Sequence, residues 1–273
     1  MRMMTKMNVA MISETAEPVM PPAKSVCMFL SDYSGWLLGC GATCIRLEKN
    51  VQRIARTYGK RAEITITPRH VHISMIAADS SETFTTIAPV RRVPVSFNTI
   101  TRLSRLSWEI ADSHLSLEEA SERFDDIVSD DRQNKWLVLV LVSLANASFC
   151  RLFGGDGAAM AIVGIATMAG YYLKQCMMEA RVDLRLVMLA CAFVSSVLGA
   201  TDYLFSVGTT PQIAIGTSIL YLVPGIPYLN SFSDMLNRYY ICSFSRFMDA
   251  VVLTGCLSIG LCCGMMMMKI GMF

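Results

Sequence analysis

The ionisable residues of this chain are distributed so unevenly that its two parts must fold in different surroundings. Residues 1–135 contain 17 of the 24 Lys and Arg residues, 16 of the 22 Asp and Glu residues, and all three His. Residues 136–273 contain only 7 basic and 6 acidic residues. A long stretch so poor in charge and rich in apolar side chains is typical of membrane-embedded helices. The sequence therefore predicts a membrane α-helical bundle preceded by a small α+β domain.

The apolar part divides into about five stretches, each near the ~20 residues that a helix needs to cross the hydrocarbon core. They are Trp136–Phe153, Gly157–Leu173, Leu186–Phe205, Val207–Leu229 and Phe247–Met268. Lys and Arg residues gather before the first stretch, between the second and third, and between the fourth and fifth. The positive-inside rule then places the N-terminal domain in the cytoplasm and the C-terminus outside.

The predicted organisation is a flexible, Pro-rich N-terminal tail over residues 1–22, a cytoplasmic α+β domain over 23–135 and a transmembrane domain over 136–273. Helical spacing of apolar residues predicts two helices in the cytoplasmic domain, and alternating β-branched residues predict a small antiparallel sheet after them. Two amphipathic helices close the domain. We expect Asn98 to cap the first of these, and the capping box that begins at Ser116 to open the second.

Motifs for catalysis or metal binding are lacking. His70, His72 and His114 are too few to complete a zinc site, and no second Cys pair accompanies Cys40 and Cys44. The sequence has no phosphate-binding Gly-x-x-x-x-Gly-Lys-[Ser/Thr] loop and no Gly-x-Ser-x-Gly nucleophile motif. We therefore expect no catalytic residue, metal or cofactor, no ATP-driven pumping and no nucleic-acid partner.

The fourth stretch is interrupted by Pro224, Gly225 and Pro227, and Asn230 and Asp234 follow. Proline lacks the backbone N–H and clashes with the preceding turn, so a helix breaks there. In hydrocarbon, a broken helix is tolerated where protein or a water-filled cavity surrounds it, and transporters use such breaks to bind substrate. A simple kink is the alternative, because Pro and Gly are common in membrane helices.

We expect the helix to stop near Val223 and restart with Pro227 at its first position. The amide N–H groups of residues 228–230 would then point into the break and favour an anionic carboxylate. Asp234 has three possible roles: a cytoplasmic gate, a proton site, or a partner of Arg238 one turn on.

Two pairs of glycines indicate where the backbone must turn sharply or helices must pack closely. Gly154 and Gly155 permit unusual backbone geometry in the turn between the first two spans, and Asp156 can cap the next helix. Gly260 and Gly264 have the small-xxx-small spacing that lets another helix approach closely. Packing within the chain is favoured over contact with a partner for this second pair.

These motifs resemble the threonine/serine exporter family, specifically its N-terminal, five-span half in the split form in which two short subunits make one exporter, as in the bacterial dicarboxylate exporter. The resemblance covers about residues 25–270. The similar segments are 41–48, 145–156 and 222–227, the last followed by Asn230 and Asp234. Cys44 departs from the family, which usually has Ser or Thr there, and the chain stops after five spans where fused members continue.

The resemblance implies ATP-independent export of small amino acids such as threonine and serine, or of a C4 dicarboxylate, across the bacterial inner membrane. It implies a second small membrane subunit as partner and membrane lipid around the spans. It also marks Gly41, Arg46 and Glu48 as a family motif in the cytoplasmic domain. An accessory or regulatory membrane protein with a cytoplasmic scaffold domain is the main alternative, and a membrane-anchored enzyme is a weaker one.

Overall fold

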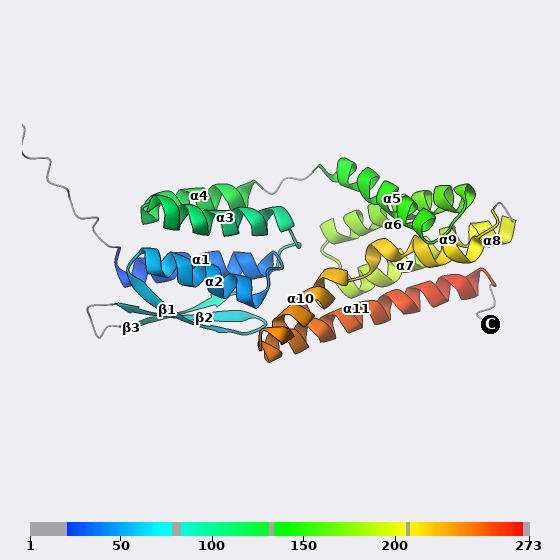
Figure 1. Cartoon of the computed structure of the whole chain (residues 1–273). Helices are drawn as coiled ribbons and strands as arrows, with labels where there is room; N and C mark the ends of the chain where they lie inside the picture. Colours follow the sequence, from blue (N-terminus) through cyan, green and yellow to red (C-terminus); the bar gives the residue numbers. More distant parts are fainter. Residues whose placement is uncertain (1–20, 78–82, 131–133, 206–207, 270–273) are drawn as a thin grey trace, which may run out of the picture. The chain divides into compact units, whose positions relative to one another are not determined.

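The structure is a computed structural model and describes residues 21–77, 83–130, 134–205 and 208–269. The chain divides into two compact units, Met1–Ser129 and Asp130–Phe273 (Figure 1). Most of the expected N-terminal tail, residues 1–20, lies outside the described residues. Pro22 is described, and it is the residue that precedes the first helix.

Within the described residues, the N-terminal unit contains helices and one small sheet. Its elements in chain order are α1 (Ala23–Gly39), α2 (Cys44–Thr57), β1 (Lys60–Ile66), β2 (His70–Ala77), β3 (Thr83–Pro89), α3 (Phe97–Ser113) and α4 (Leu117–Ser129). The strands form an antiparallel sheet in the order β1-β2-β3, with Ile73 of β2 opposite Ile64 and Thr86. The small antiparallel sheet that the alternating residues predict is confirmed.

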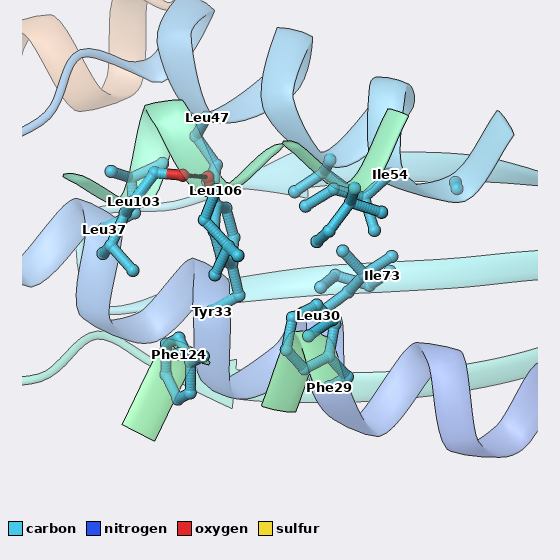
Figure 2. Packing of buried hydrophobic residues seen from close by; sticks show 14 of the residues in the cluster. Phe29, Leu30, Tyr33, Leu37, Leu47, Ile54, Ile73, Leu103, Leu106 and Phe124 are labelled. Carbon is cyan, nitrogen blue, oxygen red and sulfur yellow. Dashed lines mark hydrogen bonds between the residues drawn. The ribbon is translucent and has the colours of Figure 1, made fainter. Parts of the chain in front are cut away.

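The core of this unit lies between the sheet and the helices. Helix α1 packs on β2 and β3 while α2 packs on β1, and α3 and α4 form a further layer behind them (Figure 1). Figure 2 shows Leu30, Tyr33 and Ile73 inside this core. The Tyr33 hydroxyl donates to the carbonyl of Leu103 at 2.9 Å and accepts from the Asn50 amide at 3.0 Å. A fully buried phenol is tolerated there because both bonds are made.

The two closing helices differ in how well their caps were predicted. At α4, the amide of Ser116 donates to the Glu119 carboxylate at 3.0 Å and the Glu119 amide donates to the Ser116 hydroxyl at 3.2 Å, so the capping box is confirmed. At α3, Ser96 and not Asn98 is the cap, and its hydroxyl accepts from the Thr99 amide at 3.3 Å. The helix begins two residues earlier than expected, which places Asn98 on its exposed first turn.

Among its described residues, the C-terminal unit contains helices and connecting turns but no strand. Its elements are α5 (Lys135–Leu152), α6 (Gly157–Glu179), α7 (Leu184–Gly199), α8 (Thr201–Phe205), α9 (Pro211–Ser218), the 3-10 turn η1 (Leu220–Leu222), α10 (Gly225–Leu236) and α11 (Tyr240–Met267). Helix α7 packs against both α6 and α11, α5 packs against α6, and α10 packs against α11.

Three helical segments of the described residues are long and apolar enough to cross a membrane: Lys135–Leu152, Leu184–Phe205 and Tyr240–Met267. A bent pair, Pro211–Leu222 with Gly225–Leu236, makes a fourth if it counts as one span. Helix α6 is not among them. The structure is thus a helical membrane protein with three or four candidate spans, and five spans stay a prediction.

Small residues let α11 approach α7 closely. A Cβ at Gly260 would collide with the carbonyl oxygen of Leu189, and one at Gly264 would collide with the hydroxyl of Ser196. Both contacts lie within the chain. The small-xxx-small pair is therefore explained by packing inside the unit, as the sequence favoured.

Candidate functional site

The helix break at Pro224 is present in the structure. Helix α9 ends at Ser218, the turn η1 follows, and α10 begins at Gly225, with an angle of 61° between the two helical segments. Pro224 has φ −78° and ψ 59°, the geometry of an inverse γ-turn, and the Gly225 amide donates to the Val223 carbonyl at 2.8 Å. The interruption predicted from Pro224, Gly225 and Pro227 is thus a real change of direction.

The helix restarts two residues earlier than expected, and this changes the chemistry of the break. Pro227 is the third residue of α10 and not its first. The Tyr228 amide donates to the Pro224 carbonyl at 3.4 Å, and the amides of Leu229 and Asn230 lie inside the helix. The expectation of three free amides at residues 228–230 is therefore wrong, and the start of α10 does not form a strong anion site.

A cavity of about 380 Å³ opens beside the break, on the side where α9 ends. Its walls are mostly apolar, and its polar groups are one amide and two phenols. The lining residues are Val142, Ala145, Asn146, Phe149, Phe153, Tyr171, Leu220 and Tyr221. They come from α5 and the residue that follows it, from α6 and from η1. A small-molecule pocket has this composition, apolar walls with a few placed polar groups.

Asn146 ties this cavity to the broken helix. Its side chain is 3 % exposed and donates to the Thr217 carbonyl at 3.0 Å and to the Thr167 hydroxyl at 2.6 Å. Thr217 lies at the end of α9, where helix carbonyls lose their partners inside the helix. Asn146 therefore supports one edge of the break from α5.

Two tyrosines form the opposite wall. The Tyr221 hydroxyl lies 2.9 Å from the Ser195 hydroxyl, and its ring meets the Tyr171 ring edge-on at 6.1 Å. Gly170 makes room for this arrangement, because a Cβ there would collide with the Tyr221 hydroxyl. The Lys174 ammonium lies 5.6 Å from the centre of the Tyr171 ring, which places a positive charge one helical turn from the cavity.

The turn between α5 and α6 is organised by Asp156. Its carboxylate accepts from the Ala159 amide at 2.7 Å and from the Thr209 hydroxyl at 2.9 Å. These donors, the Ala159 amide first, hold the pKa of the carboxyl below its ordinary value. The Asp156 amide donates to the Thr210 hydroxyl at 3.0 Å. The expected cap is present, and it also fastens the segment that leads into α9.

Gly154 and Gly155 are required in this turn for different physical reasons. Gly154 has φ +90°, a conformation that side chains rarely adopt. At Gly155, a Cβ would lie 2.9 Å from the Cys150 carbonyl oxygen and 2.5 Å from its sulfur.

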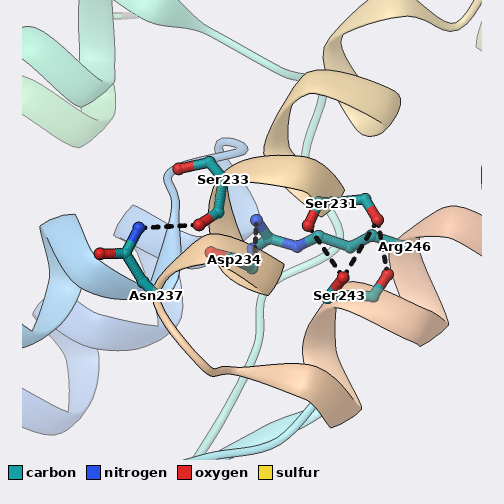
Figure 3. Close-up of polar contacts among 6 residues, drawn as sticks. All are labelled: Ser231, Ser233, Asp234, Asn237, Ser243 and Arg246. Carbon is teal, nitrogen blue, oxygen red and sulfur yellow. Dashed lines mark hydrogen bonds and ion pairs between the residues drawn. The ribbon is translucent and has the colours of Figure 1, made fainter.

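Asp234 is fully buried and forms an ion pair with Arg246 of α11, at 2.9 Å between Nη1 and Oδ2. Figure 3 shows this pair together with the hydrogen bonds between Ser231 and Ser243, which join α10 to α11. Arg238, proposed from its spacing, has a left-handed backbone after the end of α10 and is exposed. The ion pair of Asp234 therefore joins two different helices. The partner considered from the sequence, Arg238, lies one turn further along the chain from Asp234.

The remaining residues predicted for the site do not line the cavity. Pro224 is buried at the break, whereas Pro227 and Asn230 are half-buried on α10 and do not line the cavity. Gly41, with φ +96°, precedes α2 in the N-terminal unit; Arg46 of α2 is exposed, and Glu48 accepts from Gln52 at 3.1 Å. Among the described side chains, no group of three or more His, Cys, Asp or Glu residues is placed to hold a metal.

The polar residues of the cavity were not predicted from the sequence. Asn146 lies in segment 145–156, which resembles the exporter family, but only Gly154, Gly155 and Asp156 of that segment were predicted as site residues. A usable signal was present, because an amide in an otherwise apolar span needs a partner inside the bundle. Thr167 and Ser195 carried a weaker signal, since Ser and Thr hydroxyls in membrane helices often bond their own backbone.

A bundle of apolar helices with a broken span and an adjoining polar-edged cavity is typical of membrane transport proteins. Residues 29–268 match the family described as "Putative threonine/serine exporter". The chain belongs to this family, and the predicted relationship is confirmed.

Three relatives are similar to this chain, and the first two are nearer to it in length than the third. The chain is 25% identical over 234 residues to the probable succinate transporter subunit YjjP of Klebsiella aerogenes, covering 85% of this chain and 90% of that protein. It is 28% identical over 146 residues to the protein of the same name from Escherichia coli, covering 53% and 57%. A probable threonine/serine exporter of Mycobacterium tuberculosis is 19% identical, covering 82% of this chain and 43% of that protein. These names are of transporters and exporters and not of enzymes. No solved structure matches significantly.

Proposed function

We propose that this chain is a subunit of a secondary, ATP-independent exporter of a small carboxylate-bearing solute in the bacterial inner membrane, with its N-terminus in the cytoplasm. The observation that carries the proposal is the cavity beside the broken span. Its size of about 380 Å³ falls in the range of small-molecule sites. Its position beside a helix break is where transporters bind their substrates.

The chemistry of the cavity favours a C4 dicarboxylate over an amino acid. Its polar lining consists of the Asn146 amide and the hydroxyls of Tyr171 and Tyr221. The two phenols can donate hydrogen bonds to a carboxylate, whereas both hydrogens of the Asn146 amide are already engaged by Thr167 and Thr217. Lys174 adds a positive charge nearby. The lining residues include no carboxylate to meet the ammonium group of threonine or serine. Small amino acids remain the second substrate class, because backbone carbonyls at the break can also accept from an ammonium group.

A second small membrane subunit completes the proposed exporter. Large apolar side chains such as Leu141, Leu144, Leu229 and Phe244 are exposed on several helices of the C-terminal unit. Lipid covers part of such a surface, and a partner helix bundle covers the rest in our proposal. Two of the relatives are named as transporter subunits, which supports this assembly.

The direct test is efflux of labelled succinate, threonine and serine from cells that express this chain, its proposed partner subunit, or both. We expect succinate efflux above the empty-vector rate only when both are present, because one chain forms only part of the pathway. Full-rate efflux from the reconstituted chain alone would contradict the two-subunit assembly. Unchanged efflux of all three solutes would favour the accessory or scaffold alternative.

Two substitutions test the cavity itself. Tyr171→Phe removes one hydroxyl and Lys174→Gln removes the nearby charge, and neither leaves an ion pair broken among the described residues. We expect each to lower succinate efflux roughly tenfold, because the first loses one hydrogen bond to a charged group and the second loses a nearby positive charge. Ser148→Ala, on the exposed side of α5, is the matched control. Equal rates in all three variants, at equal membrane abundance, would show that the substrate does not use this cavity.

A further inference from the structure

Basic side chains surround a second hollow, on the N-terminal unit. This hollow, of about 390 Å³, is lined by Lys49, Gln52, Arg53, Arg56 and Thr57 of α2 and by Ala111 of α3. Its three cations occupy one face of α2, spaced four and then three residues apart. Like charges at this spacing repel one another, so the arrangement destabilises the helix unless something compensates.

Arg53 is held in place at the centre of this group. Its guanidinium donates to the Asn50 side-chain oxygen at 3.1 Å and to the Ser107 hydroxyl at 2.6 Å. Its central carbon also lies 3.6 Å from the centre of the Trp108 ring, a stacked cation–π contact. A guanidinium fixed by these contacts loses little conformational entropy when it binds an anion.

Acidic neighbours do not neutralise the group. Glu109 is paired with Arg123 at 2.8 Å, and Glu48 accepts from Gln52. Asp112 is exposed and acts on Arg53 electrostatically. In the described part of the chain, Lys49, Arg53 and Arg56 form no ion pair with a carboxylate. The hollow therefore keeps a net positive charge.

We propose that this hollow binds a phosphate group. The planar fork of arginine matches phosphate oxygens, and lysine adds a compact charge. Three cations around one hollow suit a phosphate or diphosphate better than a single carboxylate. The phosphate belongs either to a soluble phosphorylated metabolite or to an anionic phospholipid headgroup. The site is separate from the cavity of the C-terminal unit and does not depend on the proposed transport function.

The test is binding of labelled inorganic pyrophosphate to the full-length chain in nanodiscs. In phosphatidylcholine discs we expect saturable binding by the wild type. The double substitution Lys49→Gln with Arg56→Gln should weaken it at least tenfold. Both side chains are exposed, so the fold does not depend on them. The control is Arg61→Gln with Arg69→Gln, which removes two exposed arginines from the sheet side and changes the net charge equally.

Discs that contain phosphatidylglycerol distinguish the two sources of phosphate. A weaker apparent affinity of the wild type in these discs, absent from the Lys49/Arg56 variant, assigns the site to lipid headgroups. The same affinity in both kinds of disc assigns it to a soluble phosphate compound. The proposal is overturned if the wild type shows no saturable binding, or if the control variant loses as much affinity as the Lys49/Arg56 variant.

Discussion

Asp234→Ala is expected to lower both the thermal stability and the membrane abundance of the protein, and to reduce efflux more than tenfold. The substitution leaves Arg246, whose side chain is 22 % exposed, without its buried carboxylate partner. Breaking a buried ion pair on one side typically costs about 3–5 kcal/mol, because the remaining charge stays desolvated. Melting of the detergent-purified protein, followed by fluorescence, measures the effect.

A double substitution separates charge from packing. Asp234→Ala with Arg246→Leu removes both charges, and we expect it to regain a large part of the lost stability, since no unpaired charge remains. Asp249→Ala on the exposed side of α11 removes an acid without a buried partner and should melt like the wild type. If Asp234→Ala and Asp249→Ala melt at the same temperature, the ion pair does not stabilise the contact between α10 and α11.

Gly155→Val is expected to abolish efflux. The added Cβ would lie 2.9 Å from the Cys150 carbonyl oxygen, which already accepts from the Gly155 amide at 2.9 Å. Backbone at the end of α5 must move to relieve this contact, and such overpacking costs about 1–3 kcal/mol. The shift would also pull Asp156 away from Thr209, so the damage extends to the start of α9.

Gly157→Val is the matched control, because a Cβ at Gly157 has no neighbouring atom within 4 Å. We expect this variant to retain most of the efflux rate, although both substitutions introduce the same β-branched side chain. Efflux and membrane abundance measured together distinguish a lost pathway from a lost protein. Normal efflux by Gly155→Val would reduce this turn to a simple connection between helices.

Local sequence signals predicted local structure well. The capping box at Ser116, the cap at Asp156 and the break at Pro224 each depend on residues close together in the chain, and the structure contains all three. Errors of two residues arose where several residues nearby had the right chemistry. Ser96 and Asn98 are both good caps, and Pro227 fits the first turn of a helix at more than one position.

Partners that come from other helices could not be found in this way. The spacing of residues suggested Arg238 as the ion-pair partner of Asp234. The partner in the structure is Arg246, which the packing of α10 on α11 brings close. The cavity depends in the same manner on three separate segments, two helices and the 3-10 turn, that meet only after folding. The positions of Asn146 and Tyr221 are therefore a property of the tertiary structure, whereas the break beside them could be predicted from the sequence.

The 61° bend also sets how much bilayer the fourth candidate span can cross. Its two halves, Pro211–Leu222 and Gly225–Leu236, would reach roughly 36 Å as one straight helix at 1.5 Å per residue. With one half upright, the bend lowers this to about 27 Å, close to the ~30 Å of the hydrocarbon core. Straightening the segment would create a hydrophobic mismatch of several ångströms. The bend at Pro224 therefore brings the length of this span close to the thickness of the hydrocarbon core.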